Sequence, residues 1–303
     1  MKRLARSVMS LTAMIGATTA LAQATDDPLL RPIAPQHAAK WLTPQTPARI
    51  FGETYLVGFG GLNVGLIRTS AGLILIDGAV PQAVPAIEAN IRQLGFELGD
   101  VKLILSTEPH YDHAGGLAAL ARDSGATVVA SAAAATVLRQ GRSGADDPQA
   151  AWLPPFPAVG KVRVVHDGEK IRLGDTVVTA RATPGHTAGS MSWSWRSCEG
   201  SRCVDTLFAA SLNPMAADGY SFSDVANAAT LAAFRRTLAT VRGLPCGVLL
   251  TAHPGQAGGE EKLARLGQQP ATNPFLDAAA CRAYADRHER LLDERLATEA
   301  AAR

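Results

Sequence analysis

Four side chains that can bind a metal ion lie within one stretch of six residues: Glu108, His110, Asp112 and His113. The short, branched apolar run over residues 101–105 that precedes them is typical of a buried strand. The four side chains are therefore expected on the loop that follows this strand. Because one loop does not complete a tetrahedral zinc site by itself, the pattern predicts further ligands elsewhere in the chain.

His186 and His253 are the candidates for those distant ligands. Each follows a β-rich run and is flanked by proline and glycine, as expected for a ligand on a loop at the end of a strand. The three other histidines, His37, His166 and His288, lie in an N-terminal arm, a loop and the last helix. We interpret these three as solvated or structural residues.

The hydrophobic pattern indicates the elements that position these side chains. Hydrophobic residues make up 47% of the chain, which is ample for a packed core. Apolar runs between glycine turns predict a meander of strands over residues 54–77, and helical spacing predicts helices over residues 81–94, 231–241 and 274–297. Strands followed by helices occur twice along the chain. This order indicates two α/β halves stacked sheet to sheet, with the site at one edge between the sheets.

Two segments are predicted to lack regular structure. Residues 25–50 are rich in proline and are expected to form an irregular arm across the body. Residues 141–159 are polar and then rich in tryptophan and proline, and a loop of this length in a compact domain usually has a function. Candidates to line the mouth of the site are Trp41, Trp152, Leu153, Pro155 and Phe156, although packing beneath the loop explains them equally well.

The first 24 residues have the pattern of a signal peptide. Three basic residues precede an apolar stretch over residues 8–21, and a small-x-small cleavage site ends at Ala24. Cleavage there predicts an exported, periplasmic protein with one domain over residues 25–303. A retained membrane anchor is the alternative, but the apolar stretch is short for a span.

Removal of the leader changes the formal charge of the chain from +2 to −1, because 26 basic residues then face 27 acidic ones. No basic run remains that would indicate binding to nucleic acid or to an anionic membrane surface. We therefore expect neither partner for the mature chain. A monomer acting on a small molecule is the predicted state.

The ordered set of motifs resembles the metallo-β-lactamase family. The usual loop motif of that family is His-x-His-x-Asp-His, and here Glu108 replaces its first histidine. Residues 183–190, 210–214 and 251–255 narrow the resemblance to subclass B3, and the similarity extends over nearly the whole mature chain. The resemblance implies an α/β fold of the αββα sandwich type.

The resemblance also implies two zinc ions. Glu108, His110 and His186 would hold the first, and Asp112, His113 and His253 the second. The carboxylate of Glu108 adds negative charge, which we expect to lower the Lewis acidity of the first zinc and to alter its occupancy. In the alternative, Glu108 turns away and one zinc binds alone.

The activity implied by the resemblance is zinc-dependent hydrolysis of the amide bond of β-lactam antibiotics by a zinc-bound hydroxide. Three protein ligands per zinc leave positions open, as in catalytic rather than structural sites. Asp112 is the catalytic residue expected to orient the nucleophile, and Ser211 and Asn213 are expected to bind substrate. The alternatives are another hydrolase of the same fold, such as a lactonase, and a non-catalytic periplasmic zinc-binding protein.

The four cysteines are expected to form disulfides, because the protein is predicted to be exported. Cys198 and Cys203 flank a short turn and are predicted to pair. The pair Cys246–Cys281 matches a bridge typical of subclass B3. Metal binding by these thiols is the alternative, although no Cys-x-x-Cys arrangement is present.

Overall fold

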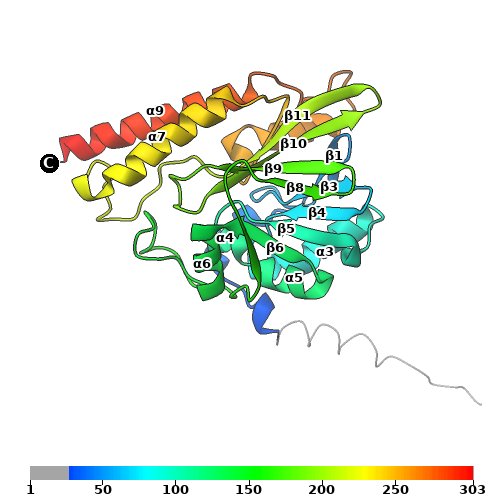
Figure 1. The fold of residues 1–303 in the computed structure, drawn as a ribbon, viewed down its shortest axis with the longest axis horizontal. Helices are drawn as coiled ribbons and strands as arrows, with labels where there is room; N and C mark the ends of the chain where they lie inside the picture. Colours follow the sequence, from blue (N-terminus) through cyan, green and yellow to red (C-terminus); the bar gives the residue numbers. More distant parts are fainter. Residues whose placement is uncertain (1–26, 303) are drawn as a thin grey trace, which may run out of the picture.

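Two sheets lie face to face between two layers of helices in the computed structural model (Figure 1), which describes residues 27–302. In Figure 1, α7 and α9 cover the upper sheet, and α3, α5 and α6 cover the lower one. This arrangement confirms the predicted αββα sandwich. The predicted signal peptide, residues 1–24, lies outside the described residues.

The first sheet of the described chain has seven strands in the order β1-β2-β3-β4-β5-β6-β7. Neighbours are antiparallel from β1 to β4 and parallel from β4 to β7. The bounds are β1 Ala48–Phe51, β2 Thr54–Leu56, β3 Gly65–Thr69, β4 Gly72–Ile76, β5 Val101–Leu105, β6 Thr127–Ser131 and β7 Val162–Val165.

The second sheet has five strands within residues 27–302, in the order β12-β11-β10-β9-β8. β11 and β12 are parallel, and the other neighbours are antiparallel. The bounds are β8 Lys170–Leu173, β9 Thr176–Ala182, β10 Met191–Glu199, β11 Arg202–Ala209 and β12 Val248–Thr251.

The helices pack outside the sheets and in the connections. The α-helices are α2 Pro35–Trp41, α3 Val84–Gln93, α4 Tyr111–Ala114, α5 Leu117–Ser124, α6 Ala132–Gln140, α7 Ala228–Gly243, α8 Gly259–Leu266 and α9 Ala280–Ala301. Short 3₁₀ helices are η1 Pro28–Leu30, η2 Pro81–Ala83, η3 Leu98–Asp100, η4 Val225–Asn227 and η5 Pro254–Gln256.

Neighbouring residues of one strand enter different layers of the core, because successive side chains point to opposite faces of a sheet. In β3, Leu66 packs with the helices outside the first sheet, whereas Ile67 packs between the two sheets. In β11, Phe208 lies between the sheets and Leu207 packs with α7 and α9. Strands buried on both faces explain the continuous apolar runs of the sequence.

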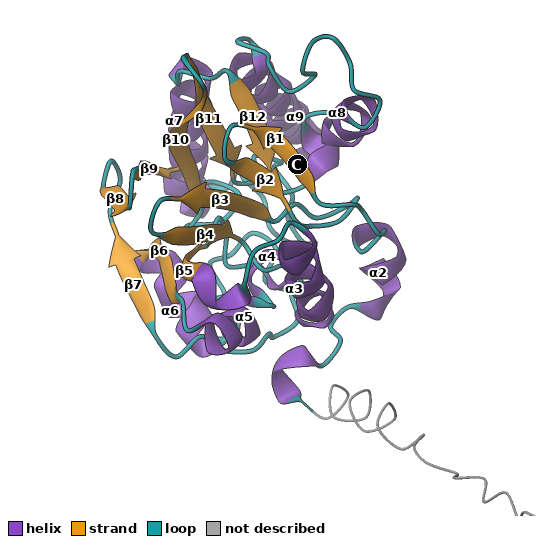
Figure 2. Cartoon of the chain, turned by 90° about the vertical axis from the view of Figure 1, so that its right-hand side faces the viewer, coloured by secondary structure: helices purple, strands orange, loops and turns teal. Residues whose placement is uncertain are grey.

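Two sequence-based predictions of elements need correction. The arm over residues 25–50 is not irregular throughout, since it contains η1, α2 and β1 (Figure 2). The last helix begins at Ala280 and not at residue 274. The segment before it is extended at Leu276, which forms a bridge to Val248 of β12, and this pairing excludes a helical backbone there.

Both predicted disulfides are present. Cys198–Cys203 links β10 to β11, and Cys246–Cys281 joins the segment before β12 to α9. No cysteine among the described residues is free, which rules out the alternative of thiol ligands.

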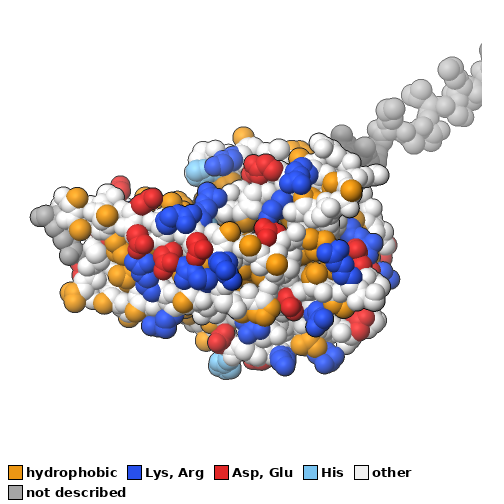
Figure 3. All heavy atoms as spheres, turned by 90° about the horizontal axis from the view of Figure 1, so that it is seen from above, with side chains coloured by type: hydrophobic (Ala, Val, Ile, Leu, Met, Phe, Trp, Pro, Cys, Tyr) orange, Lys and Arg blue, Asp and Glu red, His pale blue; other side chains and the backbone are white. Residues whose placement is uncertain are grey.

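The surface over α7 and α9 carries charges of both signs (Figure 3). Arg235 pairs with Asp293, and Arg242 pairs with Asp286 across the two helices. On this face basic and acidic side chains are therefore interspersed. Within residues 27–302, no helix combines the length and the apolar character needed to cross a membrane.

Candidate metal centre

The predicted metal-binding loop follows β5 and contains a helix of one turn. Glu108 and His110 lie between β5 and α4, and Asp112 and His113 lie within α4. Backbone hydrogen bonds start this turn, since the N–H of His113 donates to the carbonyl of His110 at 3.0 Å. All four side chains are buried.

The end of β4 anchors this loop. Asp77, directly after β4, has a φ of 66°, an uncommon conformation for a residue other than glycine. Its carboxylate accepts hydrogen bonds from the backbone N–H of Thr107 at 2.7 Å and from the hydroxyl of Thr107 at 2.6 Å. A Cβ added to Gly116 would lie 2.1 Å from the carbonyl oxygen of Gly78, so only glycine permits this close approach. The loop is thus fixed at the carboxyl ends of two parallel strands.

His186 and His253 reach the same edge of the sandwich from the second sheet. His186 follows β9, and His253 follows β12. Gly185 has a φ of 146°, and a Cβ there would lie 2.4 Å from the ring of Phe234. The turn that presents His186 therefore requires glycine. Both histidines lie at strand ends, as predicted.

Oxygen acceptors orient three of the histidine rings. Nδ1 of His186 lies 2.9 Å from the carbonyl oxygen of Asn213, and Nδ1 of His253 lies 3.0 Å from that of Gly61. Because a carbonyl oxygen only accepts, both Nδ1 atoms carry the proton, and both Nε2 atoms are acceptors. His110 Nε2 lies 2.9 Å from Asp147 Oδ2. Orientation of one ring nitrogen by an oxygen is typical of histidines that bind metals.

The histidines form two adjoining groups. We call Asp112, His113 and His253 the α4 group, in which the two Nε2 atoms lie 3.1 Å apart and Asp112 Oδ2 lies 3.4 Å from each of them. We call His110 and His186 the loop pair, whose ring centroids are 5.0 Å apart. The structure therefore brings the histidines predicted from distant motifs into one cluster.

Glu108 lies against the α4 group. Its Oε1 is 2.9 Å from His113 Nε2, and the ligand atoms of Glu108, His113 and His253 all lie within 4.8 Å of one another. Ser211 holds both carboxylate oxygens, because its backbone N–H donates to Oε2 at 3.0 Å and its hydroxyl donates to Oε1 at 2.7 Å. The short polar contacts of Glu108 within residues 27–302 thus favour the α4 group over the loop pair.

Burial and charge act in opposite directions on the pKa values of the site. Burial alone raises the pKa of Glu108 and of Asp112, but the positive charge of the adjacent His113 lowers both pKa values below their usual range. Burial likewise lowers the pKa of His113, but these two carboxylates raise it more. For His186 burial dominates and lowers the pKa. The centre therefore combines ionised carboxylates with at least one neutral imidazole.

The donor set fits a metal ion of the zinc type. Four imidazoles and two carboxylates lie close together, all of them buried except His253, which is partly exposed, and zinc binds both kinds of ligand. His113 Nε2 lies 2.9 Å from Glu108 Oε1 and 3.4 Å from Asp112 Oδ2, so positive charge is favoured between these two carboxylates, which is the place that a cation would take. The Nε2 lone pair of His253 faces the cluster, because its Nδ1 donates outward, whereas Nε2 of His186 lies 3.2 Å from Gln149 Nε2.

Two residues of the centre were missed by the sequence analysis. Asp147, which orients His110, and Gln149, whose Nε2 lies 3.2 Å from His186 Nε2, both belong to the loop over residues 141–159. The sequence analysis considered only the apolar residues of this loop. Of these, Phe156 is buried and Trp152 is 50% exposed. Asp147 and Gln149 belong to the polar run before them, residues 146–149, whose pattern does not indicate which of its side chains turn inward.

The two residues expected to bind substrate have different surroundings. The hydroxyl of Ser211 donates to Glu108, as described above. Asn213 accepts a hydrogen bond from His186 through its backbone carbonyl, and its side-chain Oδ1 is buried without a partner. The side chain of Asn213 thus keeps a polar atom available, whereas that of Ser211 is engaged.

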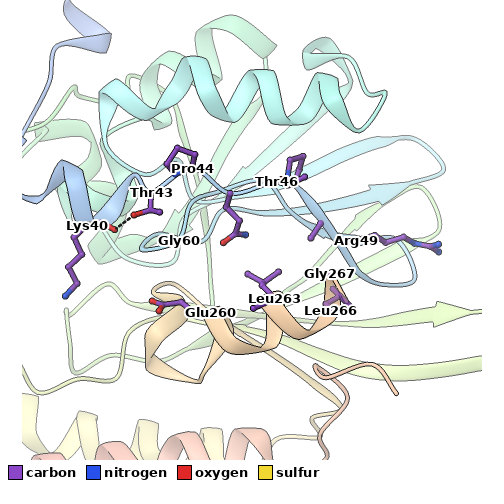
Figure 4. Close-up of a pocket in the computed structure, with 14 residues that line it drawn as sticks. Lys40, Thr43, Pro44, Thr46, Arg49, Gly60, Glu260, Leu263, Leu266 and Gly267 are labelled. Carbon is purple, nitrogen blue, oxygen red and sulfur yellow. Dashed lines mark hydrogen bonds between the residues drawn. The ribbon is translucent and has the colours of Figure 1, made fainter. Parts of the chain in front are cut away.

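A cavity of about 910 Å³ lies beside the metal centre, between the arm and α8 (Figure 4). Its lining includes Thr43, Arg49, Leu263 and Leu266 and contains none of the six candidate ligands. Gly60, at its edge, precedes the glycine whose carbonyl orients His253. The cavity therefore adjoins the metal centre but does not include its candidate ligands.

Comparison with known proteins agrees with this geometry. The sequence profile of the metallo-beta-lactamase superfamily matches residues 57–257. A B3 metallo-β-lactamase characterised as the first with an active site glutamic acid is 52% identical with a TM-score of 0.84, over 90% of this chain and 98% of that chain. MEM-A1, a subclass B3 enzyme isolated from a soil metagenome library, is 45% identical with a TM-score of 0.84, over 87% and 100% of the two chains.

A more distant structure shows the same similarity. BJP-1, a subclass B3 metallo-β-lactamase of Bradyrhizobium japonicum, is 35% identical with a TM-score of 0.79, over 88% of this chain and 99% of that chain. The profile match spans more than half of this sequence, and the similar structures are matched over nearly their full length. The chain therefore belongs to the metallo-β-lactamase superfamily and, within it, to subclass B3.

Proposed function

We propose that this protein is an exported enzyme that hydrolyses the amide bond of β-lactam antibiotics with two zinc ions per chain. The observation that carries the proposal is the convergence of four histidines and two carboxylates at one edge of the sandwich. The similar B3 enzyme with an active site glutamic acid supports it, because Glu108 lies in this cluster.

The six side chains divide between the two proposed zinc ions. Glu108, His110 and His186 hold the first zinc, and Asp112, His113 and His253 hold the second. Bound zinc supplies a Lewis acid that polarises a carbonyl group and makes water more acidic at neutral pH.

The protein's own residues orient the reactants. Asp112 Oδ2 accepts a hydrogen bond from the attacking water and thereby directs it toward the β-lactam carbonyl. The carbonyls of Asn213 and Gly61 keep the Nε2 atoms of His186 and His253 turned inward. Gln149, which is buried beside His186, excludes bulk water on the side of the loop. Asn213, whose side-chain Oδ1 has no hydrogen-bond partner among the described residues, binds a polar group of the substrate.

The proposed location is the periplasm, with residues 1–24 removed and residues 25–303 forming one monomeric domain. The two disulfides are consistent with an oxidising compartment. The mature chain has a formal charge of −1 and is proposed to bind neither nucleic acid nor membrane.

The test is hydrolysis of a chromogenic cephalosporin and of a carbapenem by purified residues 25–303, with added zinc and with a chelator. We expect zinc-dependent turnover of both substrates that the chelator abolishes, and two zinc ions per chain by elemental analysis. Asp112→Ala should lower kcat/KM by at least about 100-fold, because it removes a group that touches zinc and the attacking water.

Asp146→Asn serves as the control, because Asp146 is an exposed neighbour of the loop residues and should leave turnover unchanged. Two zinc ions bound without β-lactam turnover would overturn the proposal. In that event, hydrolysis of a lactone would indicate a lactonase, and no hydrolysis at all would indicate a zinc-binding protein.

A further inference from the structure

A chain of hydrogen bonds leads from the last helix to Glu108. The hydroxyl of Tyr284, in α9, donates to Gln256 Oε1 at 2.7 Å. Gln256 Nε2 donates to Ser211 Oγ at 3.2 Å, and the Ser211 hydroxyl donates to Glu108 Oε1 at 2.7 Å. Tyr284, Ser211 and Glu108 are buried, so these bonds face little competition from water.

The Tyr284 hydroxyl has one proton and two acceptors, Gln256 Oε1 at 2.7 Å and the carbonyl oxygen of Ala210 at 3.1 Å, and its shorter contact is to Gln256. The directions of the other bonds are determined. A carboxylate only accepts, so the single hydroxyl proton of Ser211 points to Glu108. Ser211 Oγ then accepts from Gln256, which turns the NH2 group of Gln256 toward Ser211 and its Oε1 toward Tyr284. Each donor in the chain therefore points toward the metal centre.

We propose that Ser211, Gln256 and Tyr284 are positioning residues that fix the carboxylate of Glu108, and that Ser211 serves Glu108 rather than the substrate. The inference rests on the proposed zinc enzyme, in which Glu108 is a ligand. While Ser211 donates to Glu108, it has no second proton to donate to a substrate carboxylate. This assignment replaces the sequence-based expectation for Ser211.

The network has a firm attachment at each end. Tyr284 lies one turn after Cys281, whose disulfide with Cys246 joins α9 to the segment before β12. Arg287, also in α9, donates to the backbone carbonyl of Gln256 at 3.3 Å. At the other end, the backbone N–H and the hydroxyl of Ser211 hold separate oxygens of the same carboxylate. Two attachments of this kind fix the plane of the carboxylate as well as its position.

The same geometry makes the network specific for a carboxylate. Glu108 offers two acceptor oxygens, and Ser211 supplies one donor to each. An imidazole at this position has at most one acceptor nitrogen, and a metal ion would occupy it. We therefore expect the network to matter when residue 108 is glutamate and to matter little when it is histidine.

The experiment measures zinc affinity of metal-free residues 25–303 by competition with a chromogenic chelator. Gln256→Met and Tyr284→Phe each remove one link with little change in volume, and both are made with Glu108 and in a Glu108→His background. With Glu108, each substitution should weaken the more weakly bound zinc by about 10–100-fold, as is usual for groups that orient metal ligands. In the Glu108→His background, each should change affinity by less than about 3-fold.

Tyr55→Phe is the matched control, since it removes a hydroxyl that contacts Glu53. It should leave zinc affinity unchanged in both backgrounds. Equal losses in the two backgrounds, or no loss from either link substitution with Glu108, would overturn the inference. The readout does not depend on turnover, so failure of the proposed β-lactamase activity would be recognised separately from failure of the network.

Discussion

The α4 group and the loop pair are supported in different ways. In the α4 group, Asp112 Oδ2 lies within 3.4 Å of both histidine Nε2 atoms, and the ligands come from the helical turn α4 and from the end of β12, an edge strand of the second sheet. In the loop pair, one ring nitrogen of each histidine contacts a side chain of the loop over residues 141–159, namely Asp147 or Gln149. The ligands of the α4 group therefore contact one another, whereas each histidine of the loop pair contacts a side chain of a long loop.

This difference has an energetic consequence. Ligands that already lie close together lose little conformational freedom when a metal ion binds, whereas a loop must be ordered at the same time. We expect the α4 group to bind zinc more tightly than the loop pair.

The largest effect is expected from removing a ligand of the α4 group. His253→Ala should lower zinc content after dialysis to less than one ion per chain and reduce kcat/KM by at least about 1000-fold, which exceeds the usual effect of residues outside the ligand shell. His186→Ala is the matched substitution in the loop pair, since both rings donate through Nδ1 to a backbone carbonyl. It should leave one tightly bound zinc, as elemental analysis after dialysis would show. If the two variants retained zinc equally, the contrast between the groups would be wrong.

An intermediate effect is expected at Asp147. Asp147→Asn keeps the size of the side chain but weakens the bond that orients His110. Zinc binding to the loop pair should weaken by about 10–100-fold, while the tighter zinc remains unaffected. Zinc titration monitored by chelator competition provides the measurement, with Asp146→Asn as the control. Equal weakening of both zinc ions would show that the loop supports the whole centre.

The smallest effect on the metal centre is expected from His288. Its titration should change the stability of the fold at low pH without changing zinc binding at pH 7. Burial lowers the pKa of His288 to about 4, whereas an unfolded chain has a histidine pKa near 6.5. The unfolded state therefore takes up the proton first as the pH falls below 6.5. The contribution of His288 to the free energy of unfolding should be fully present above pH 6.5. It should decrease by up to about 3 kcal/mol between pH 6.5 and pH 4.

His288→Leu should remove this contribution, because leucine does not titrate. Urea unfolding of the metal-free protein from pH 7 to pH 4 would measure it, and zinc content at pH 7 should not change. A variant with the same pH dependence as the natural chain would show that His288 does not titrate on unfolding.

The sequence was most informative where hydrophobic runs end in polar residues. The run over residues 101–105 and the runs before His186 and His253 are strands, and their ends meet at one edge because both sheets direct those ends to the same side. The strand pattern therefore predicted which residues come together. The order of strands followed by helices, which occurs twice, predicted two stacked α/β halves, and the family resemblance implied the αββα sandwich.

The partners of Glu108, His110 and His186 were not predictable from the sequence. Asp147 and Gln149 lie in a loop without periodicity, so no pattern indicates which of its polar residues turn inward. The link from Tyr284 to Gln256 joins segments that approach each other only through the packing of α9 on the second sheet. Hydrogen bonds of this kind depend on long-range packing, whereas strand ends depend on local pattern.

Stepwise zinc titration of the metal-free natural chain and of Glu108→Ala tests most directly whether the α4 group and the loop pair differ in zinc affinity. We predict two resolved phases of one zinc each, with the weaker phase shifted to higher zinc concentration in Glu108→Ala. A single phase of two equivalent zinc ions, or identical titrations of the two proteins, would contradict the inequality of the two groups or the role of Glu108 as a ligand.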